Sequence, residues 1–113
     1  MTDTRPGPEP LTPAVFHVLL ALSRGALHGY GVMKRVQEDS GVEMGPGTVY
    51  GTLHRLMEAG WAREGSEDDS DVRRGRVFHL TAEGRAALAA EAGRITRLAG
   101  MDDVRRLLPE RGT

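Results

Sequence analysis

The sequence of 113 residues predicts one mostly α-helical domain with a small β-hairpin. Three observations lead to this fold class. Four stretches carry apolar residues at the three- and four-residue spacing of a helix. Two short segments alternate in the manner of strands, and glycine or proline marks the turns between the stretches. The balance of 39% hydrophobic and 27% charged residues is typical of a folded globular chain and excludes a disordered one.

The first helix is expected to begin at Thr12-Pro13, with threonine as the N-cap and proline at the first helical position. Gly25 is expected to end it. One apolar stripe runs along this helix, and Phe16 and Leu20 form a second apolar side. A helix that is apolar nearly all round is buried on two sides. Because the chain is small, we expect a second copy of the chain to cover the second side.

A second helix is predicted over 29–39, with Met33 and Val36 facing the core. The turn at 45–48 leads into a third helix over 46–59. Apolar residues spaced for one helical face form the core stripe of this third helix: Val49, Leu53, Leu56 and Met57. Its opposite side collects small, polar and charged residues: Gly47, Thr48, Gly51, His54, Arg55 and Glu58.

Segments 61–64 and 76–80 have strand character and are predicted to form a long hairpin. The loop between them is strongly acidic at its start. It ends in a cluster of arginines, Arg73, Arg74 and Arg76, which by itself is typical of a solvated run of charges.

Thr81 is expected to cap a fourth helix. Apolar residues then recur close to the spacing of a coiled-coil seam, at Leu88, Ala92, Ile95 and Ala99. Gly100 either kinks one long helix or separates two. The seam has no obvious partner within one small domain, so we expect it to pair with a second copy of the chain.

Three helices, a hairpin and a last helix, in that order, predict a winged helix-turn-helix. In this arrangement the second and third helices form the DNA-reading unit and the hairpin is the wing. The chain is therefore divided into a flexible arm at 1–10, a winged helix-turn-helix domain at 11–81, a dimerisation helix at 82–108 and a tail at 109–113.

Residues for several other chemistries are missing. There is no cysteine, which excludes disulfides, thiolate metal sites and a cysteine nucleophile. The 4 histidines lack the spacing of a zinc site, and the glycine-rich turn lacks the Gly-Lys-Ser/Thr of a phosphate loop. We therefore expect no catalytic residue, no metal and no cofactor. No apolar run is long enough to span a membrane and no secretory signal is recognisable, so a cytoplasmic location is expected.

Four stretches of the chain resemble the PadR family of transcriptional regulators. These are LHGYG at 27–31, GPGTVY at 45–50, LHRLMEAGW at 53–61 and FHLTAEG at 78–84. The similarity extends over about residues 11–100, in the family's order and spacing. It implies a dimeric repressor whose third helix enters the major groove, whose wing lies along the DNA and whose last helix pairs with the partner subunit.

The outward positions and the resemblance together give candidate site residues. Hydroxyls suit phosphate contacts, and histidine and arginine can bond base edges. Tyr30 fits the core equally well. The candidate DNA-binding residues are Tyr30, Lys34, Gly47, Thr48, Tyr50, Gly51, His54, Arg55, Arg73, Arg74 and Arg76. The candidate dimer-interface residues are Phe16, Leu20, Leu88, Ala92, Ile95 and Ala99.

Two alternatives stay open at this point: another winged-helix family, distinguished by whether the last helix forms the dimer, and a winged helix that binds protein and no DNA. The wing lacks the proline and one tyrosine of the family's common Arg-Pro-Arg-Lys-Tyr-Tyr motif. Its acidic loop and the net charge of −1 favour a winged helix that binds protein and no DNA, whereas the outward His54-Arg55 pair and the wing arginines favour DNA. The resemblance also implies a pocket near the dimer interface for a small aromatic effector, although the last helix has no aromatic residue to stack on one.

Overall fold

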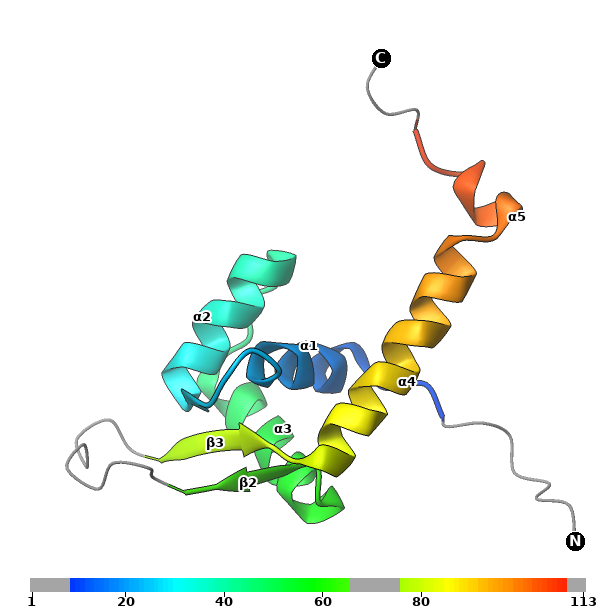
Figure 1. Ribbon diagram of the computed structural model, residues 1–113. Helices are drawn as coiled ribbons and strands as arrows, with labels where there is room; N and C mark the ends of the chain where they lie inside the picture. The colour runs from blue at the N-terminus through cyan, green and yellow to red at the C-terminus, as the bar shows by residue number, and fades with distance from the viewer. Residues whose placement is uncertain (1–8, 66–75, 110–113) are drawn as a thin grey trace, which may run out of the picture.

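The computed structural model describes residues 9–65 and 76–109, which form a helical body with a small sheet and a projecting C-terminal part (Figure 1). The elements are α1 (Pro13–Leu22), β1 (Leu27–His28), α2 (Gly29–Ser40), α3 (Pro46–Ala59), β2 (Ala62–Glu64), β3 (Val77–Leu80), α4 (Ala82–Ala99) and α5 (Asp102–Arg105). The predicted mostly α-helical class is therefore confirmed. None of the described helices is long and apolar enough to cross a membrane.

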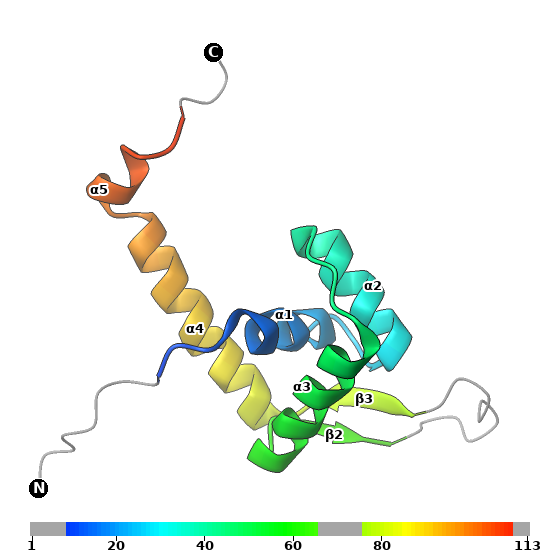
Figure 2. The same ribbon diagram turned by 180° about the vertical axis from the view of Figure 1, so that it is seen from behind.

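Helix α1 lies at the centre of the body and contacts α2, α3 and α4 (Figures 1 and 2). The Thr12 hydroxyl accepts a hydrogen bond from the Val15 N–H at 3.3 Å, and Pro13 begins the helix, which confirms the predicted start. The helix ends at Leu22, earlier than predicted. Gly25 lies in the turn that follows, with a φ of +146° that favours glycine.

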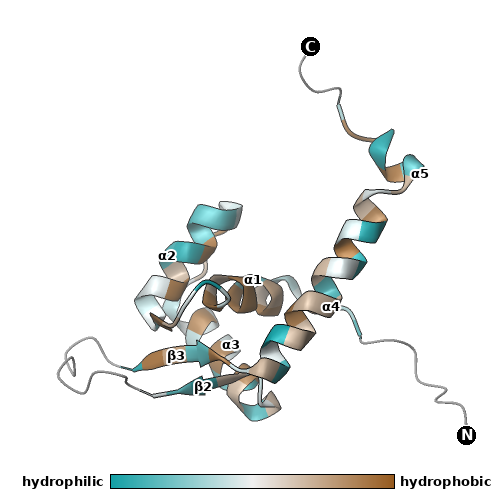
Figure 3. Cartoon of the chain, in the orientation of Figure 1, coloured by the Kyte–Doolittle hydropathy of each residue, from teal (hydrophilic) through white to brown (hydrophobic). Residues whose placement is uncertain are grey.

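The second apolar side of α1 packs partly within the chain itself. Val18 and Leu19 are fully buried, and Phe16 and Leu20 are half-buried against the same core. In Figure 3 the ribbon of α1 is accordingly brown, the colour of hydrophobic residues, along most of the part in view. Only the remaining exposed part of Phe16 and Leu20 is left for the second copy of the chain that the sequence predicts.

The core face of α2 differs from the prediction by one residue. Met33 is half-buried, whereas Val32 and Val36 are completely buried. Gly29 is buried as well, so the buried positions recur at steps of three and four. Met33, four residues after Gly29 and three before Val36, shares this face and packs against the core, as predicted, while Val32 is the fully buried residue that the prediction left out.

The sheet has three antiparallel strands in the order β1-β3-β2, where the sequence predicts only a two-stranded hairpin. Strand β1 pairs with β3, with Leu27 opposite Phe78. A strand of two residues is too short to show alternation, so the pattern could not reveal it. Strand β2 begins at Ala62 and not at Trp61, because the Trp61 N–H donates to the Leu56 carbonyl of α3 at 2.8 Å.

The first turn of α4 is anchored to the turn between α3 and β2. The Thr81 hydroxyl accepts a hydrogen bond from the Gly84 N–H at 3.0 Å and donates one to the Gly60 carbonyl at 2.7 Å. The Thr81 N–H donates to the Trp61 carbonyl at 3.1 Å. A Cβ atom built on Gly84 would lie 2.1 Å from that carbonyl oxygen. Thr81 is therefore the predicted cap, and Gly84 permits the close approach.

Beyond this anchor, α4 leaves the body and Gly100 separates it from α5 (Figure 1). Leu88 is only 7% exposed and belongs to the core of the body. The prediction that the seam finds no partner within the chain is wrong at Leu88, because α4 packs against α1. Farther along the seam Ala92 is half-buried, Ile95 is 40% exposed and Ala99 is exposed.

We expect Gly84→Ala to lower the free energy of unfolding by about 1–3 kcal/mol, the usual cost of overpacking. The added methyl group meets the fixed Trp61 carbonyl. Gly93→Ala in the same helix is the matched control, since a Cβ there meets nothing within 4 Å. That change should raise stability by up to about 1 kcal/mol through helix propensity. Urea unfolding measures both, and equal effects at the two glycines would contradict the anchor.

Candidate nucleic-acid interface

The outer side of α3 is exposed along the helix, while its inner side is buried. Val49 and Leu53 have no exposed area and Leu56 has 1%. The residues predicted to face outward are all exposed: Gly47, Thr48, Gly51, His54, Arg55 and Glu58. The helical period therefore identified correctly which side of α3 is available to a partner.

This outer side of α3 combines one unpaired cation with two glycines. Within the described residues Arg55 forms no ion pair. His54 lies 3.6 Å from Glu58 one turn later, and this ion pair exists only when the imidazole is protonated. A Cβ atom at Gly47 or Gly51 would meet nothing within 4 Å, so packing within the chain requires neither glycine. The glycines leave a flat helix surface that another backbone can approach closely.

Tyr50 joins three elements at the edge of the same side. Tyr50 is 51% exposed. Its ring packs edge to face against the ring of Phe78 in β3, with the two ring centroids 6.3 Å apart. A Cβ atom on Gly29, the first residue of α2, would lie 2.2 Å from the Tyr50 hydroxyl oxygen. Gly29 therefore makes room for Tyr50, which keeps its hydroxyl beside the start of α2. The phosphate contact predicted for Tyr50 stays a prediction.

Helix α2 adds exposed side chains beside the start of α3. Tyr30 is 73% exposed and Lys34 is also exposed, so Tyr30 does not belong to the core. Both line a shallow pocket of about 590 Å³, together with Glu43 and Gly45 from the segment before α3. The fold thus brings two predicted phosphate contacts of α2 to the edge where α3 begins.

The base of the wing is the part of the wing that the structure describes. Arg76, just before β3, has a side chain that is 73% exposed, and its Nη1 donates to Glu64 Oε1 of β2 at 2.8 Å. An exposed pair of this kind contributes little stability. Arg73, Arg74 and the acidic loop residues lie outside the described residues.

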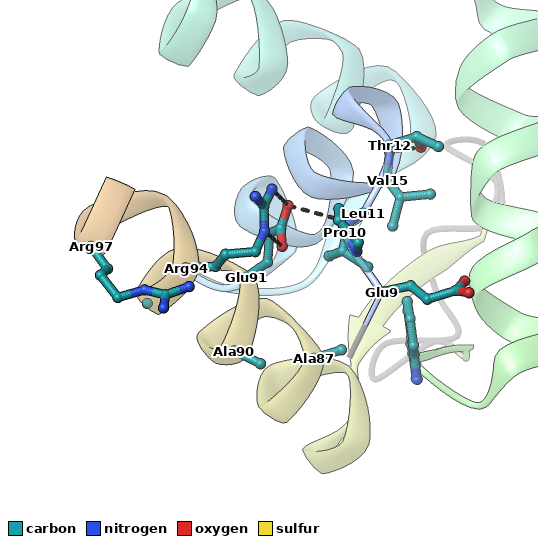
Figure 4. A pocket seen from close by; sticks show the side chains of 12 residues that line it. Glu9, Pro10, Leu11, Thr12, Val15, Ala87, Ala90, Glu91, Arg94 and Arg97 are labelled. Atoms are coloured by element: carbon teal, nitrogen blue, oxygen red, sulfur yellow. Dashed lines mark hydrogen bonds and ion pairs between the residues drawn. The ribbon is translucent and has the colours of Figure 1, made fainter. Parts of the chain in front are cut away.

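A groove of about 910 Å³ lies between residues 9–15 and α4 (Figure 4). Glu91 lies in it and is only 5% exposed. Its carboxylate accepts the Leu11 N–H at 3.2 Å and two Arg94 N–H groups at 2.8 and 2.7 Å. The Arg94 hydrogen bond, followed by that from Leu11, holds the pKa of Glu91 below its ordinary value, and the carboxylate raises the pKa of Arg94. This pair ties the segment before α1 to α4.

No pattern in the sequence indicates that Glu91 is buried. Glu91 and Arg94 have the spacing of an ordinary exposed pair on a helix surface. The Leu11 amide that completes the site lies 80 residues earlier in the chain. Among the described residues, no group of three or more His, Cys, Asp or Glu side chains could hold a metal ion.

Known proteins are similar to this chain in sequence and in fold. The model of the transcriptional regulator PadR-like family matches residues 18–90. The chain belongs to the PadR-like family. It is 34% identical over 83 residues to the transcriptional regulator Rv3488 of Mycobacterium tuberculosis, a match that covers 74% of this chain and 76% of that protein.

A second relative of this PadR-like chain is an uncharacterized 37.1 kDa protein in transposon TN4556 of Streptomyces fradiae. The two are 41% identical over 83 residues, which are 74% of this chain and 23% of that protein. This chain therefore matches about a quarter of the length of that relative.

Solved structures show the same fold. A PadR family transcription regulator from Clostridium difficile R20291 has a TM-score of 0.66 at 22% identity, over 78% of this chain and 95% of that chain. F93 of STIV, a winged-helix DNA-binding protein, has a TM-score of 0.61 at 15% identity, over 77% and 89%. Bordetella bronchiseptica BpsR, whose DNA binding is regulated by 6-hydroxynicotinic acid, has a TM-score of 0.59 at 28% identity, over 86% and 68%. The winged-helix fold is thereby confirmed, and PadR-like proteins are transcriptional regulators and not enzymes.

We expect Glu91→Gln to lower the stability of this PadR-like chain at neutral pH, because an amide cannot form the ion pair with Arg94. Since the folded state lowers the pKa of Glu91, the carboxylate contributes stability above the ordinary pKa of glutamate and loses it as the pH falls through the lowered value. Urea midpoints of the two proteins should differ at pH 7 and converge in acid. Glu38→Gln, which removes an exposed pair with Arg35 at 3.8 Å, is the control and should change little. A difference that persists at low pH contradicts the role of the charge.

Proposed function

We propose that this chain represses transcription in the cytoplasm by binding an inverted-repeat operator in double-stranded DNA as a homodimer. The observation that carries the proposal is the exposed outer side of α3, where an unpaired Arg55 lies among glycines that packing within the chain does not require. A helix with such a surface fits the major groove, where arginine can donate two hydrogen bonds to guanine. The resemblance to PadR repressors supports repression over activation.

The roles of individual residues follow from their positions. Base-edge contacts are assigned to His54 and Arg55, and close approach to the DNA backbone to Gly47 and Gly51. Exposed hydroxyls and cations around them are assigned to phosphates: Tyr30, Lys34, Thr48, Tyr50, Arg73, Arg74 and Arg76. Because the net charge of the chain is −1, binding depends on this local clustering of cations and not on overall charge.

An apolar stripe along α4 and the residues after it supports the homodimer. Its large side chains are Ile95, Leu98, Met101, Leu107 and Leu108, and they are between 39% and 81% exposed. Exposed apolar patches of this kind mark interaction sites. We assign the dimer contact to this stripe and to the remaining candidates Ala92, Ala99, Phe16 and Leu20.

Pairing through α4 gives the chain a simple division. Residues 11–81 form the DNA-binding unit, residues 82–108 form the dimerisation unit, and residues 1–10 and 109–113 are an arm and a tail. Two-fold pairing places two α3 helices about 34 Å apart, one turn of DNA, which requires an operator with two inverted half-sites.

We extend the proposal to a small aromatic effector in the groove between residues 9–15 and α4. Trp61 lines this groove, so the turn before β2 supplies the aromatic ring that α4 lacks. Arg97 lines it as well and offers a cation to an aromatic acid. The fold is similar to that of BpsR, whose DNA binding is regulated by 6-hydroxynicotinic acid. Trp61 is the single tryptophan of the chain, so quenching of its fluorescence by an aromatic acid measures binding at this groove.

The alternative function is a winged helix that binds protein and no DNA, which the net charge of −1 and the acidic loop favour. Selection of duplexes from a random pool at about 0.1 M salt, where charges more than about 10 Å apart are screened, separates the two functions. Enrichment of an inverted repeat supports our proposal. Recovery of no enriched sequence contradicts it.

We expect Arg55→Ala to weaken binding to the selected operator by about 1–3 kcal/mol, the usual cost of losing an arginine–guanine contact. Folding should be unchanged, because Arg55 is exposed and forms no ion pair within the described residues. Arg106→Ala is the charge-matched control, since its side chain is 71% exposed on the segment after α5 and pairs only with Asp103 there. Titration by gel shift measures both, and equal affinities of the two variants would remove Arg55 from the interface.

We expect Ile95→Asp combined with Leu98→Asp to give a folded monomer that binds the operator at least about tenfold more weakly, because one half-site supplies too few contacts. Leu88 is avoided, since it belongs to the core. Ala86→Asp with Ala89→Asp adds the same charge at exposed positions on another side of α4 and should leave the assembly intact. Light scattering reports the mass. A native monomer that binds the operator tightly contradicts the homodimer.

A further inference from the structure

A shallow pocket of about 350 Å³ lies where the turn after α1, strands β2 and β3 and the first turns of α4 meet. Its charged lining consists of three arginines, Arg24, Arg63 and Arg85, without a carboxylate. His79, which is only 8% exposed, also lines it. None of the residues that line this pocket is assigned above to DNA, to the dimer or to the aromatic effector.

The alternation of side chains along β3 places this pocket on the side of the sheet away from α3. Phe78 turns its ring toward Tyr50 of α3, so His79, the next residue, projects from the opposite face. Arg63 of β2 is the direct partner of His79, and directly opposite residues share a face. Figure 2 shows α3 in front of the sheet and Figure 1 shows it behind.

The positive charge of this pocket is not balanced by carboxylates, unlike the charges of two other pockets of the described chain. The groove beside α4 holds Arg94 and Arg97 but also Glu9 and Glu91. The pocket beside α2 holds Lys34 but also Glu43. Those two pockets thus contain both positive and negative side chains, while the charged side chains of the pocket of about 350 Å³ are all arginines.

Two of its three guanidinium groups lack a counter-ion among the described residues. Arg24 pairs with Asp39, which is not part of the lining. Arg85 donates only to the Ser23 carbonyl, a neutral acceptor, at 3.3 Å. Arg63 forms no ion pair within the described residues. Positive charges that cluster in a concave site raise the local concentration of anions.

We propose that this pocket binds a small phosphate-bearing anion, with Arg63 and Arg85 donating hydrogen bonds to the phosphate oxygens. The planar fork of a guanidinium matches two oxygens of one phosphate, and such charge-assisted bonds are stronger than neutral ones. Because the site is concave and lies away from α3, a small anion fits it better than the backbone of the DNA that α3 binds. The anion bridges β2 of the wing to the first turns of α4.

The test is titration calorimetry of the full chain with pyrophosphate at about 0.1 M salt, where distant surface charges are screened. Arg63→Gln with Arg85→Gln should weaken binding about tenfold or more, because two charge-assisted hydrogen bonds are lost. Arg35→Gln with Arg105→Gln removes the same charge outside the pocket and should leave the affinity within about twofold of the native value. If the double variant unfolds, Arg63→Gln alone takes its place, because Arg63 is exposed and forms no ion pair within the described residues. Weaker pyrophosphate binding by this folded single variant then supports the proposal.

Two further titrations identify the source of the phosphate. Equal affinity for tripolyphosphate and ATP assigns the pocket to inorganic phosphate chains, and tighter binding of ATP assigns it to nucleotides; both outcomes support the proposal. Pyrophosphate that does not bind the native chain, or that binds both double variants equally, overturns it. Loss of duplex binding in the Arg63, Arg85 variant without any pyrophosphate binding also overturns it, and assigns the arginines to the DNA backbone.

Discussion

The contact between Gly84 and the Trp61 carbonyl is the constraint on which the arrangement of the molecule depends. Because Gly84 carries no side chain, the first turn of α4 can lie directly on the turn that ends α3. The reading helix and the wing lead to this turn from one side, and α4 leaves it on another (Figure 1). The same junction directs Leu88 into the core and carries Ile95 beyond it. A single close approach therefore fixes α3, the helix proposed to bind DNA, relative to α4, the helix proposed to pair two copies.

Charge is distributed so that a nearly neutral chain can still present cations to anionic partners. The chain carries 16 acidic and 15 basic residues. In the described part, carboxylates neutralise some of the arginines, as at Glu91–Arg94 and Asp39–Arg24. Arg55 and Arg63 have no such partner there and lie on different sides of the body. Local fields of exposed cations, and not the net charge, then govern binding of anions.

The parts of the fold that the sequence predicts are those that local patterns encode. Helix α3 is 14 residues long, which is enough for its period to separate the buried side from the side with Arg55. Thr12 and Thr81 predict where α1 and α4 begin, because an N-cap hydrogen bond involves only residues that are close in the sequence. The exposed face of α3 that we propose binds DNA could therefore be predicted from the sequence alone.

The parts that the sequence does not predict depend on contacts between distant residues. Strand β1 exists because Leu27 meets Phe78, and two residues carry no alternation of their own. Glu91 is buried because Leu11 reaches it across 80 positions of the chain. Leu88, which the sequence predicts to pair with a second copy, is buried in the core because α4 packs against α1. Periodicity shows on which face of a helix or strand a side chain lies, but tertiary packing decides what covers that face.

Hydroxyl-radical footprinting of the native chain on its selected duplex tests the central claim most directly, because it reports where two reading helices lie on one DNA molecule. The account predicts two equal protected patches on one face of the duplex, centred about 34 Å or one helical turn apart and related by the two-fold axis of the operator. A single protected patch at saturation, or two patches in direct repeat, would contradict the pairing of two copies through α4.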